Sequence, residues 1–354
     1  VEEVVNDADA AVVGSALIRE IEQNLDDQGN ATKGLVNEVL VHARPLAVPI
    51  CRDRQQIFFV TCHDASNDLV VLGQIDSLDS GGSAAQVPAG ARLYELDVTE
   101  SVESAFEDFS PDDVIHLAAQ VSVAVSMQDP EMDARINVLG SLNIIGAARR
   151  HGVRRIVYAS SAACYGVQDR DVLSEEMRCV PASFYGASKY AVEHCLLSAR
   201  EDSGLEWAAL RFANVYGPRQ DPHGEAGVVA IFARLLLDGG QPKIFGGGEL
   251  KRDYIFVEDV ARAVALMLEV ELDGCEDPIF NCSTALGTTT NQIYELLKAA
   301  CSSGVDALAG PWRPGDVQSL ILNNTRLKRL LDWAPRVPLE EGIGRTAEYF
   351  RDAT

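Results

Sequence analysis

The sequence predicts an α/β protein in which a doubly wound parallel sheet is followed by a smaller C-terminal lobe. From about residue 92, short apolar runs typical of buried strands alternate with longer segments of helical periodicity. Such βαβ repetition produces parallel strands joined by right-handed helical crossovers. After residue 214 the pattern changes to short elements rich in Pro and Gly, which indicates the second lobe.

The individual elements follow from these patterns in chain order. We expect strands at 57–61, 69–72, 92–96, 114–117, 156–159 and 207–211. Helices are expected to begin near residue 99 and to span 129–151 and 185–202. In the second lobe we expect helices at 227–237, 257–269, 290–300 and 324–331, with a turn at the glycines 246–248.

Composition narrows the possible functions. The chain has 354 residues and a net charge of −23, which argues against nucleic acid and anionic membrane surfaces as partners. Its eight cysteines are scattered without CxxC spacing, and its six histidines show no metal-ligand spacing. Because no apolar run is long enough for a membrane span and the acidic N-terminus lacks a secretory signal, we expect a cytoplasmic protein without a metal site.

The most informative motif is Tyr185-Gly-Ala-Ser-Lys189 at the start of a predicted helix. Tyr185 and Lys189 lie on one helix face, and an ammonium beside a phenol lowers the phenol's pKa toward that of a general base. Ser160 and Ser161 end the preceding apolar strand, so a hydroxyl can share a substrate's proton. Together these groups suit proton removal from an alcohol while a hydride leaves the same carbon. Taken alone, the pair could equally be a packed Tyr and a solvated Lys.

Ordered motifs from about residue 91 to the C-terminus resemble the extended short-chain dehydrogenase/reductase family, and within it the UDP-glucose 4-epimerases. These motifs are Asp113-Val-Ile-His-Leu-Ala-Ala-Gln120, Asn137-Val-Leu-Gly140, Ser160-Ser-Ala-Ala-Cys-Tyr-Gly166, Tyr185-Gly-Ala-Ser-Lys189, Arg211-Phe-Ala-Asn-Val-Tyr-Gly-Pro-Arg219, Arg252-Asp-Tyr-Ile-Phe-Val257 and Arg313-Pro-Gly-Asp316. The resemblance implies a Rossmann-like fold, the cofactor NAD and a UDP-sugar substrate. It also implies a nucleotide-binding domain at 57–213 with a contribution from 250–282, and a sugar-nucleotide lobe mainly at 214–354.

The implied reaction is 4-epimerisation of a UDP-hexose through a transient 4-keto sugar, with Ser161, Tyr185 and Lys189 as catalytic residues. Ala162 and Ala163 stand where the family's 4,6-dehydratases carry Asp-Glu, which favours epimerisation. Two alternatives stay open: another nucleotide-sugar enzyme, such as a UDP-GlcNAc 4-epimerase, or a cofactor-deficient paralogue that only binds the sugar nucleotide.

The resemblance also assigns binding residues. The expected cofactor contacts are Asp76, Asp97, Val98, Leu117, Ala118, Ala119, Asn137, Tyr185 and Lys189. The expected substrate contacts are Asn214 for phosphate or sugar, Arg252 and Arg313 for the diphosphate, and Asp316 for the uridine ribose. An Arg guanidinium suits the diphosphate because it presents a fork of donors, although a surface ion pair is the alternative role for each Arg.

A homodimer is expected from the helices at 131–150 and 185–201, which are apolar on more than one face. In the family the corresponding helices pair across a two-fold axis. Burial of these faces within one monomer is the alternative.

The first 90 residues depart from the family. The expected GxxGxxG turn and its helix, which hold the dinucleotide pyrophosphate, do not follow the strand at 57–61. Asp64 and Asp68 stand there instead and would repel phosphate, so we expect weak NAD binding unless the turn at 8–14 folds back into the vacant place. Residues 1–56 are atypical: 1–48 loosely resemble the tail of a tryptophan synthase alpha chain, while Gly14 matches the last glycine of a dinucleotide loop. A fused segment, a displaced loop or a disturbed sequence would each explain this.

Overall fold

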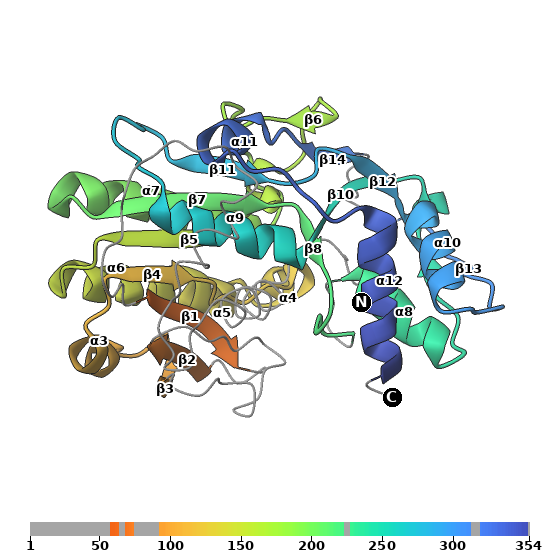
Figure 1. The fold of residues 1–354 in the computed structure, drawn as a ribbon, viewed down its shortest axis with the longest axis horizontal. Helices are drawn as coiled ribbons and strands as arrows, with labels where there is room; N and C mark the ends of the chain where they lie inside the picture. Colours follow the sequence, from red (N-terminus) through yellow and green to blue (C-terminus); the bar gives the residue numbers. More distant parts are fainter. Residues whose placement is uncertain (1–56, 64–67, 74–91, 223–226, 313–318, 353–354) are drawn as a thin grey trace.

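A seven-stranded sheet forms the centre of the larger part of the molecule. The computed structural model describes residues 57–63, 68–73, 92–222, 227–312 and 319–352 (Figure 1). The strand order is β11-β7-β5-β4-β1-β2-β3. These strands are β1 (Ile57–His63), β2 (Asp68–Gly73), β3 (Arg92–Asp97), β4 (Asp113–His116), β5 (Arg155–Ser161), β7 (Glu206–Phe212) and β11 (Ile279–Cys282). Strands β1, β4, β5, β7 and β11 run parallel, as expected for a doubly wound sheet.

Strand β2 departs from the expected all-parallel arrangement, because it runs antiparallel to both β1 and β3. His63 at the end of β1 pairs with Asp68 at the start of β2. The four residues between them are too few for a helical crossover, which takes about a dozen residues. As a result, Gly73 at the end of β2 pairs with Phe58, at the amino edge of the parallel strands. Asp76, Asp64 and Gly14 lie outside the described residues.

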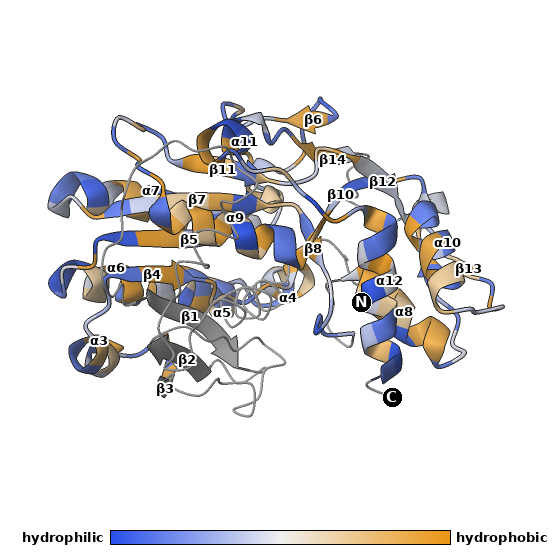
Figure 2. Cartoon of the chain, viewed as in Figure 1, coloured by the Kyte–Doolittle hydropathy of each residue, from blue (hydrophilic) through white to orange (hydrophobic). Residues whose placement is uncertain are grey.

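Alternating side chains of the central strands build a core on each face of the sheet. Val114, Ile156 and Trp207 pack with the helices on one face, and Ile115 and Val157 pack toward the other. The first face carries α3 (Glu103–Phe109), α6 (Ser141–Arg150) and α7 (Phe184–Ser203), and the second carries α9 (Val257–Glu269). Figure 2 shows β4, β5 and β7 as mostly hydrophobic, which suits parallel strands covered on both faces.

The helix expected over 129–151 is divided into three consecutive parts. They are α5 (Pro130–Ala134), a π-helix over Arg135–Gly140 and α6, and they follow α4 (Val123–Gln128). A π-helical segment widens the backbone by one residue and occurs frequently at functional sites. Here it contains Asn137, one of the expected cofactor contacts.

The second lobe combines small sheets with helices. Its strands are β6 (Val172–Leu173), β8 (Asn214–Tyr216), β9 (Lys243–Ile244), β10 (Lys251–Phe256), β12 (Gly287–Thr289), β13 (Leu308–Ala309) and β14 (Ser319–Leu322). Its helices are α8 (Val228–Leu237), α10 (Thr290–Ala300), α11 (Thr325–Leu331) and α12 (Leu339–Asp352). One apolar cluster runs continuously from Ile115 in the large sheet to Phe232, Ile293 and Ile343 in the lobe. This shared core holds the lobe against the sheet (Figure 1).

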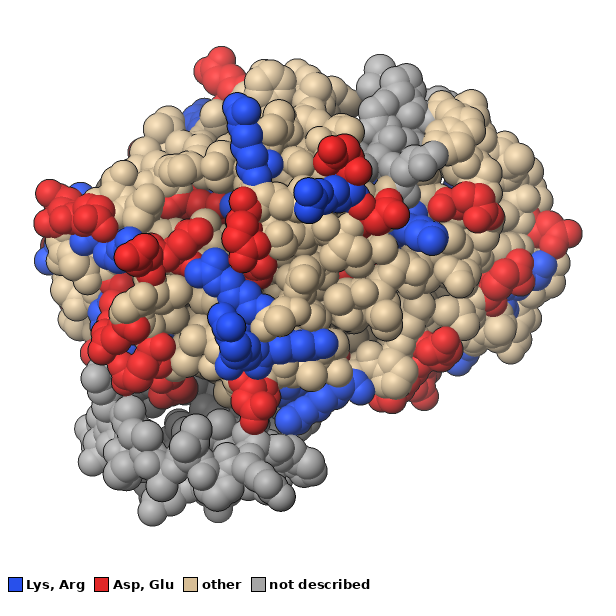
Figure 3. All heavy atoms as spheres, turned by 90° about the horizontal axis from the view of Figure 1, so that it is seen from above, with Lys and Arg blue, Asp and Glu red and all other residues tan. Residues whose placement is uncertain are grey.

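None of the helices in the described ranges is long and apolar enough to cross a membrane. Among the same residues, no group of three His, Cys, Asp or Glu side chains is arranged to hold a metal ion. On the face seen in Figure 3, acidic side chains lie at both ends and in the middle, and basic side chains lie among them singly or in small groups. The basic groups on that face are therefore local rather than spread over a broad surface.

Candidate active site

Helix α7 carries the expected Tyr185–Lys189 pair. Ser183 begins the helix, and its hydroxyl accepts a hydrogen bond from the Gly186 N–H at 3.1 Å. Tyr185 and Lys189 are each only 2% exposed. The Lys189 Nζ lies 5.8 Å from the centroid of the Tyr185 ring and donates to the Ala159 carbonyl at 2.9 Å. The Lys is therefore a buried neighbour of the phenol and not a solvated side chain.

Ser161 ends strand β5 next to the start of α7. Its hydroxyl oxygen accepts from the Ala163 N–H at 3.1 Å and so caps the 3-10 helix over Ala162–Tyr165. Because this bond uses Ser161 as an acceptor, its O–H can still donate to a substrate. A Cβ on Gly186 would lie 2.5 Å from the Ala163 carbonyl oxygen. The glycine thus allows the first turn of α7 to approach the segment that follows Ser161.

The loop after β4 supplies apolar residues near the end of β5. Leu117 and Ala118 are buried at the carboxyl end of the strand, and Ala119 follows them. The Asn137 side chain holds the next residue: its Oδ1 accepts from the Gln120 N–H at 2.8 Å, and its Nδ2 donates to the Gln120 carbonyl at 2.9 Å. Asn137 therefore fixes the shape of this loop.

Asp97 is the last residue of strand β3, and Val98 follows it. The Asp97 carboxylate accepts from the Thr99 N–H at 2.8 Å. Val98 is 1% exposed, and a Cβ on Gly140 would lie 2.8 Å from its Cγ2. Since the Val98 side chain is packed against the π-helix, only its backbone is placed to meet a ligand.

The expected substrate residues that the structure describes lie on adjoining strands of the lobe. Asn214 on β8 pairs with Tyr254 on β10, and Arg252 stands two residues before Tyr254. Residues two apart on a strand point to one face, so Arg252 and Tyr254 share a face. The Arg252 residue is 5% exposed, and its Nη1 donates to the Lys251 carbonyl at 3.0 Å. Arg313 and Asp316 lie outside the described residues.

Asp253 is a buried anchor that the sequence did not single out, although it directly follows Arg252. Its carboxylate accepts from the Thr284 hydroxyl at 2.6 Å, from the Thr284 and Ala285 N–H groups at 3.0 Å and from the Leu322 N–H at 3.2 Å. Burial raises its pKa, while these bonds act in the opposite direction. Through them, Asp253 ties β10 to the neighbouring loop and to β14.

A buried histidine was also missed, although its place in the apolar run Val-Ile-His-Leu is visible in the sequence. The His116 Nε2 lies 2.8 Å from the Ser141 hydroxyl, which itself donates to the Asn137 carbonyl at 2.6 Å. The hydroxyl has one hydrogen, so Nε2 must be the donor and His116 is the Nε2–H tautomer. Burial, with a smaller contribution from the Lys189 charge, lowers the pKa of His116 to about 3.

This pKa predicts a pH dependence of stability. Between about pH 6.5 and pH 3 the unfolded chain binds a proton at His116 that the folded chain does not, so stability falls as pH falls. We expect the free energy of unfolding of the parent, measured in urea, to fall between pH 7.5 and pH 5.5 by about 1.4 kcal/mol more than that of His116→Gln. Equal losses in the two proteins would contradict a neutral, buried His116.

Comparisons with known proteins agree with this geometry. The model of the NAD dependent epimerase/dehydratase family matches residues 65–283. A UDP-glucose 4-epimerase of Mycolicibacterium smegmatis is 43% identical over 263 residues, which are 74% of this chain and 82% of that protein. The crystal structure of a Thermotoga maritima UDP-glucose 4-epimerase with UDP-glucose is 41% identical, with a TM-score of 0.74, over 77% of this chain and 89% of that one. The crystal structure of a Thermus thermophilus UDP-glucose 4-epimerase in complex with NAD is 40% identical, with a TM-score of 0.73. The match covers 78% of this chain and 89% of that one. The chain therefore belongs to the NAD dependent epimerase/dehydratase family.

Proposed function

We propose that the protein is an NAD-dependent 4-epimerase that interconverts UDP-glucose and UDP-galactose through a transient 4-keto sugar. The observation that carries the proposal is the buried Tyr185–Lys189 pair beside the hydroxyl of Ser161. Relatives that are 40–43% identical bear the name UDP-glucose 4-epimerase. In this proposal residues 57–213, with 250–282, hold the dinucleotide, and 214–354 mainly hold the sugar nucleotide.

Each of the three side chains has a separate task. Tyr185 takes the proton of the sugar 4-OH and later returns it, so it acts first as a base and then as an acid. The Lys189 ammonium, held by the Ala159 carbonyl, stabilises the phenolate between these two steps. Ser161 donates to the sugar oxygen and so aligns it with the phenol. When bound beside these residues, NAD would supply the reversible hydride transfer at C4 of the sugar.

The residues after Ser161 support epimerisation over dehydration. Removal of water across a neighbouring carbon–carbon bond needs an acid and a base beside the sugar. Ala162 and Ala163 carry no ionisable group, and the Ala163 carbonyl faces Gly186 at the start of α7. These two residues therefore favour return of the hydride to the 4-keto sugar over loss of water.

The described residues fit the two ends of NAD unequally. At the nicotinamide end, we assign Leu117, Ala118 and Ala119 to an apolar wall and Lys189 to the nicotinamide ribose. At the pyrophosphate end, β1 and β2 form an antiparallel pair instead of a crossover with a helix N-terminus. A pyrophosphate thus loses the backbone N–H groups that a helix would present after β1.

The proposed location is the cytoplasm. All six cysteines in the described ranges are free, which suits a reducing compartment.

Replacing the base should abolish turnover. We expect Tyr185→Phe to lower kcat for UDP-galactose by about 100-fold or more, because general base catalysis contributes at least that factor. Activity is measured by coupled detection of UDP-glucose with NAD added, and the fold by circular dichroism. Tyr190→Phe on the same helix is the matched control and should keep parental activity. A Tyr185→Phe protein as active as the parent would overturn the mechanism.

Arg252 should carry part of the affinity for UDP. Loss of a charge-assisted bond to phosphate weakens binding by about 1.5–3 kcal/mol, or roughly ten- to a hundred-fold in Kd. Titration calorimetry with UDP on Arg252→Ala measures this. Lys328→Ala on α11 changes the net charge equally at an exposed position and should bind as the parent does. Equal affinity in both variants would count against Arg252.

The chain should retain little NAD. Among the residues that the structure describes, β1 is followed by an antiparallel strand and not by a helix whose N-terminus could hold the pyrophosphate, so we expect purification to yield well under one NAD per chain. Acid release followed by chromatographic quantitation gives the ratio. Insertion of a GxxGxxG turn and a crossover helix between β1 and β2 should raise it. Near-full occupancy of the unaltered chain would show that the pyrophosphate is held in another way.

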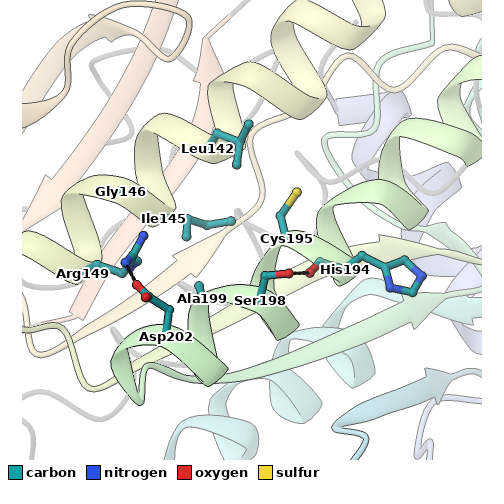
Figure 4. Close-up of a pocket in the computed structure, with 9 residues that line it drawn as sticks. All are labelled: Leu142, Ile145, Gly146, Arg149, His194, Cys195, Ser198, Ala199 and Asp202. Carbon is teal, nitrogen blue, oxygen red and sulfur yellow. Dashed lines mark hydrogen bonds and ion pairs between the residues drawn. The ribbon is translucent and has the colours of Figure 1, made fainter.

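We also infer that two copies form a homodimer through α6 and α7. A groove between these helices is lined by Leu142 and Ile145 of α6 and by Cys195, Ser198 and Ala199 of α7 (Figure 4). The ion pair between Arg149 and Asp202 closes one end of it. Leu139 is 53% and Leu142 is 42% exposed along the same segment, so a second copy that covered the groove would also cover these two side chains.

Sedimentation equilibrium tests this interface. The parent should have twice the chain mass, and Leu142→Glu should give monomers because two carboxylates would be buried at the contact. Leu286→Glu, at a position 67% exposed in the second lobe, should stay dimeric. A monomeric parent would refute the inference.

A further inference from the structure

Glu193 extends the line of catalytic side chains on helix α7 by one more turn. Tyr185, Lys189 and Glu193 are spaced by four residues, so they share one face, and each is 2% exposed. The Lys189 Nζ donates to the carbonyl of Ala159, and the Glu193 Oε1 accepts from the hydroxyl of Ser160 at 2.6 Å. The helix therefore bonds to the two residues of β5 that come directly before Ser161.

Arg211 joins this contact from the neighbouring strand. It stands opposite Ser160 in the register of β5 and β7. Its Nε donates to Glu193 Oε1 at 3.0 Å and its Nη2 to Glu193 Oε2 at 2.7 Å, which is the bidentate geometry that favours an Arg–carboxylate pair. Its guanidinium carbon lies 4.7 Å from the centroid of the Tyr165 ring, in the 3-10 helix that follows Ser161. The ion pair thus touches the chain on both sides of Ser161.

The burial of this pair calls for an explanation other than stability. Both side chains are almost fully buried, at 2% and 1% exposure. Buried ion pairs are often no more stabilising than apolar residues of the same volume, because both charges lose their hydration. Burial lowers the pKa of Arg211, but the bonds and the charge of Glu193 outweigh it, so the pKa is raised overall. Arg211 therefore stays charged, and its two parallel bonds to Glu193 stay directional.

From this geometry we propose that Glu193 and Arg211 are positioning residues, which hold the end of β5 against α7 and so set Ser161 relative to Tyr185 and Lys189. The proposal rests on the proposed epimerase function for its kinetic consequence. A displacement of about 1 Å at a catalytic group can lower the rate by roughly a hundred-fold. The pair acts through Ser160 and Tyr165 and does not itself contact the substrate.

The test compares two matched variants. Glu193→Gln keeps the side-chain shape but turns one of the two acceptors into an N–H group that faces the Arg211 donors. Glu206→Gln is the control, since Glu206 pairs with Arg155 across the same two strands at their opposite ends. We expect Glu193→Gln to lower kcat about ten- to a hundred-fold with little change in KM. Glu206→Gln should leave both at parental values.

A second readout does not depend on turnover. Ultraviolet absorbance is recorded as a function of pH for each variant and for the same variant that also carries Tyr185→Phe. The difference between the two titrations is the absorbance of the Tyr185 phenolate. The midpoint of its pH titration should move to higher pH in the double variant Glu193→Met with Arg211→Met, which leaves the net charge unchanged, because Lys189 is no longer held against the phenol. The midpoint should not move in Glu206→Gln. If the parent proves inactive as an epimerase, the proposed function fails but this shift still tests the positioning pair.

Should Glu193→Gln fail to fold, the double variant Glu193→Met with Arg211→Met removes both charges at similar volume. It should fold and show the same fall in kcat together with the shift of the phenolate midpoint. Parental kcat in a folded variant of either kind, with a parental midpoint in the double variant, would overturn the proposal and leave the pair a purely structural role.

Discussion

The site depends on the docking of the first three turns of α7 onto the end of β5. Three buried polar side chains of the helix point at this strand end, and two of them bond to it directly: Lys189 to the Ala159 carbonyl and Glu193 to the Ser160 hydroxyl. Gly186 makes the approach possible, because any Cβ there would collide with the Ala163 carbonyl. Strand β5 ends at Ser161, and α7 begins 23 residues later at Phe184. These contacts join the two ends into one rigid unit.

The polar groups around this unit are buried and mutually bonded. His116, Ser141 and Asn137 form a chain of hydrogen bonds from β4 to the π-helix, and the Asn137 amide continues it to the loop at Gln120. Polar groups in a low-dielectric interior are stable only when they have partners, so each of them restricts the next. The neutral state of His116 belongs to this arrangement, since a second buried cation beside Lys189 would be strongly unfavourable.

The antiparallel β2 changes what the sheet can offer a dinucleotide. In a doubly wound sheet the ligand lies at the carboxyl ends of the parallel strands, where helix N-termini and loops converge. Strands β4, β5 and β7 preserve this edge, and the proposed catalytic side chains lie at it. Strand β2 instead runs antiparallel to β1 and ends at the opposite edge. The chemical half of the site is thus independent of the half that would hold the pyrophosphate.

The sequence by itself determined the fold class, most of the helices, the strands of the large sheet other than β11, and the identity of the pair Tyr185 and Lys189. These features depend on local periodicity and on spacing within one helix, which a sequence displays directly. The sequence did not predict α12 or the short strands of the second lobe. The tertiary structure alone decided that Asn137 holds a loop, that Val98 is packed into the core, that β2 runs antiparallel, and that Glu193 bonds to Arg211. These depend on which segments meet in space. The partners of Glu193, for example, stand on two different strands, and only the packing of α7 across the sheet brings the three together.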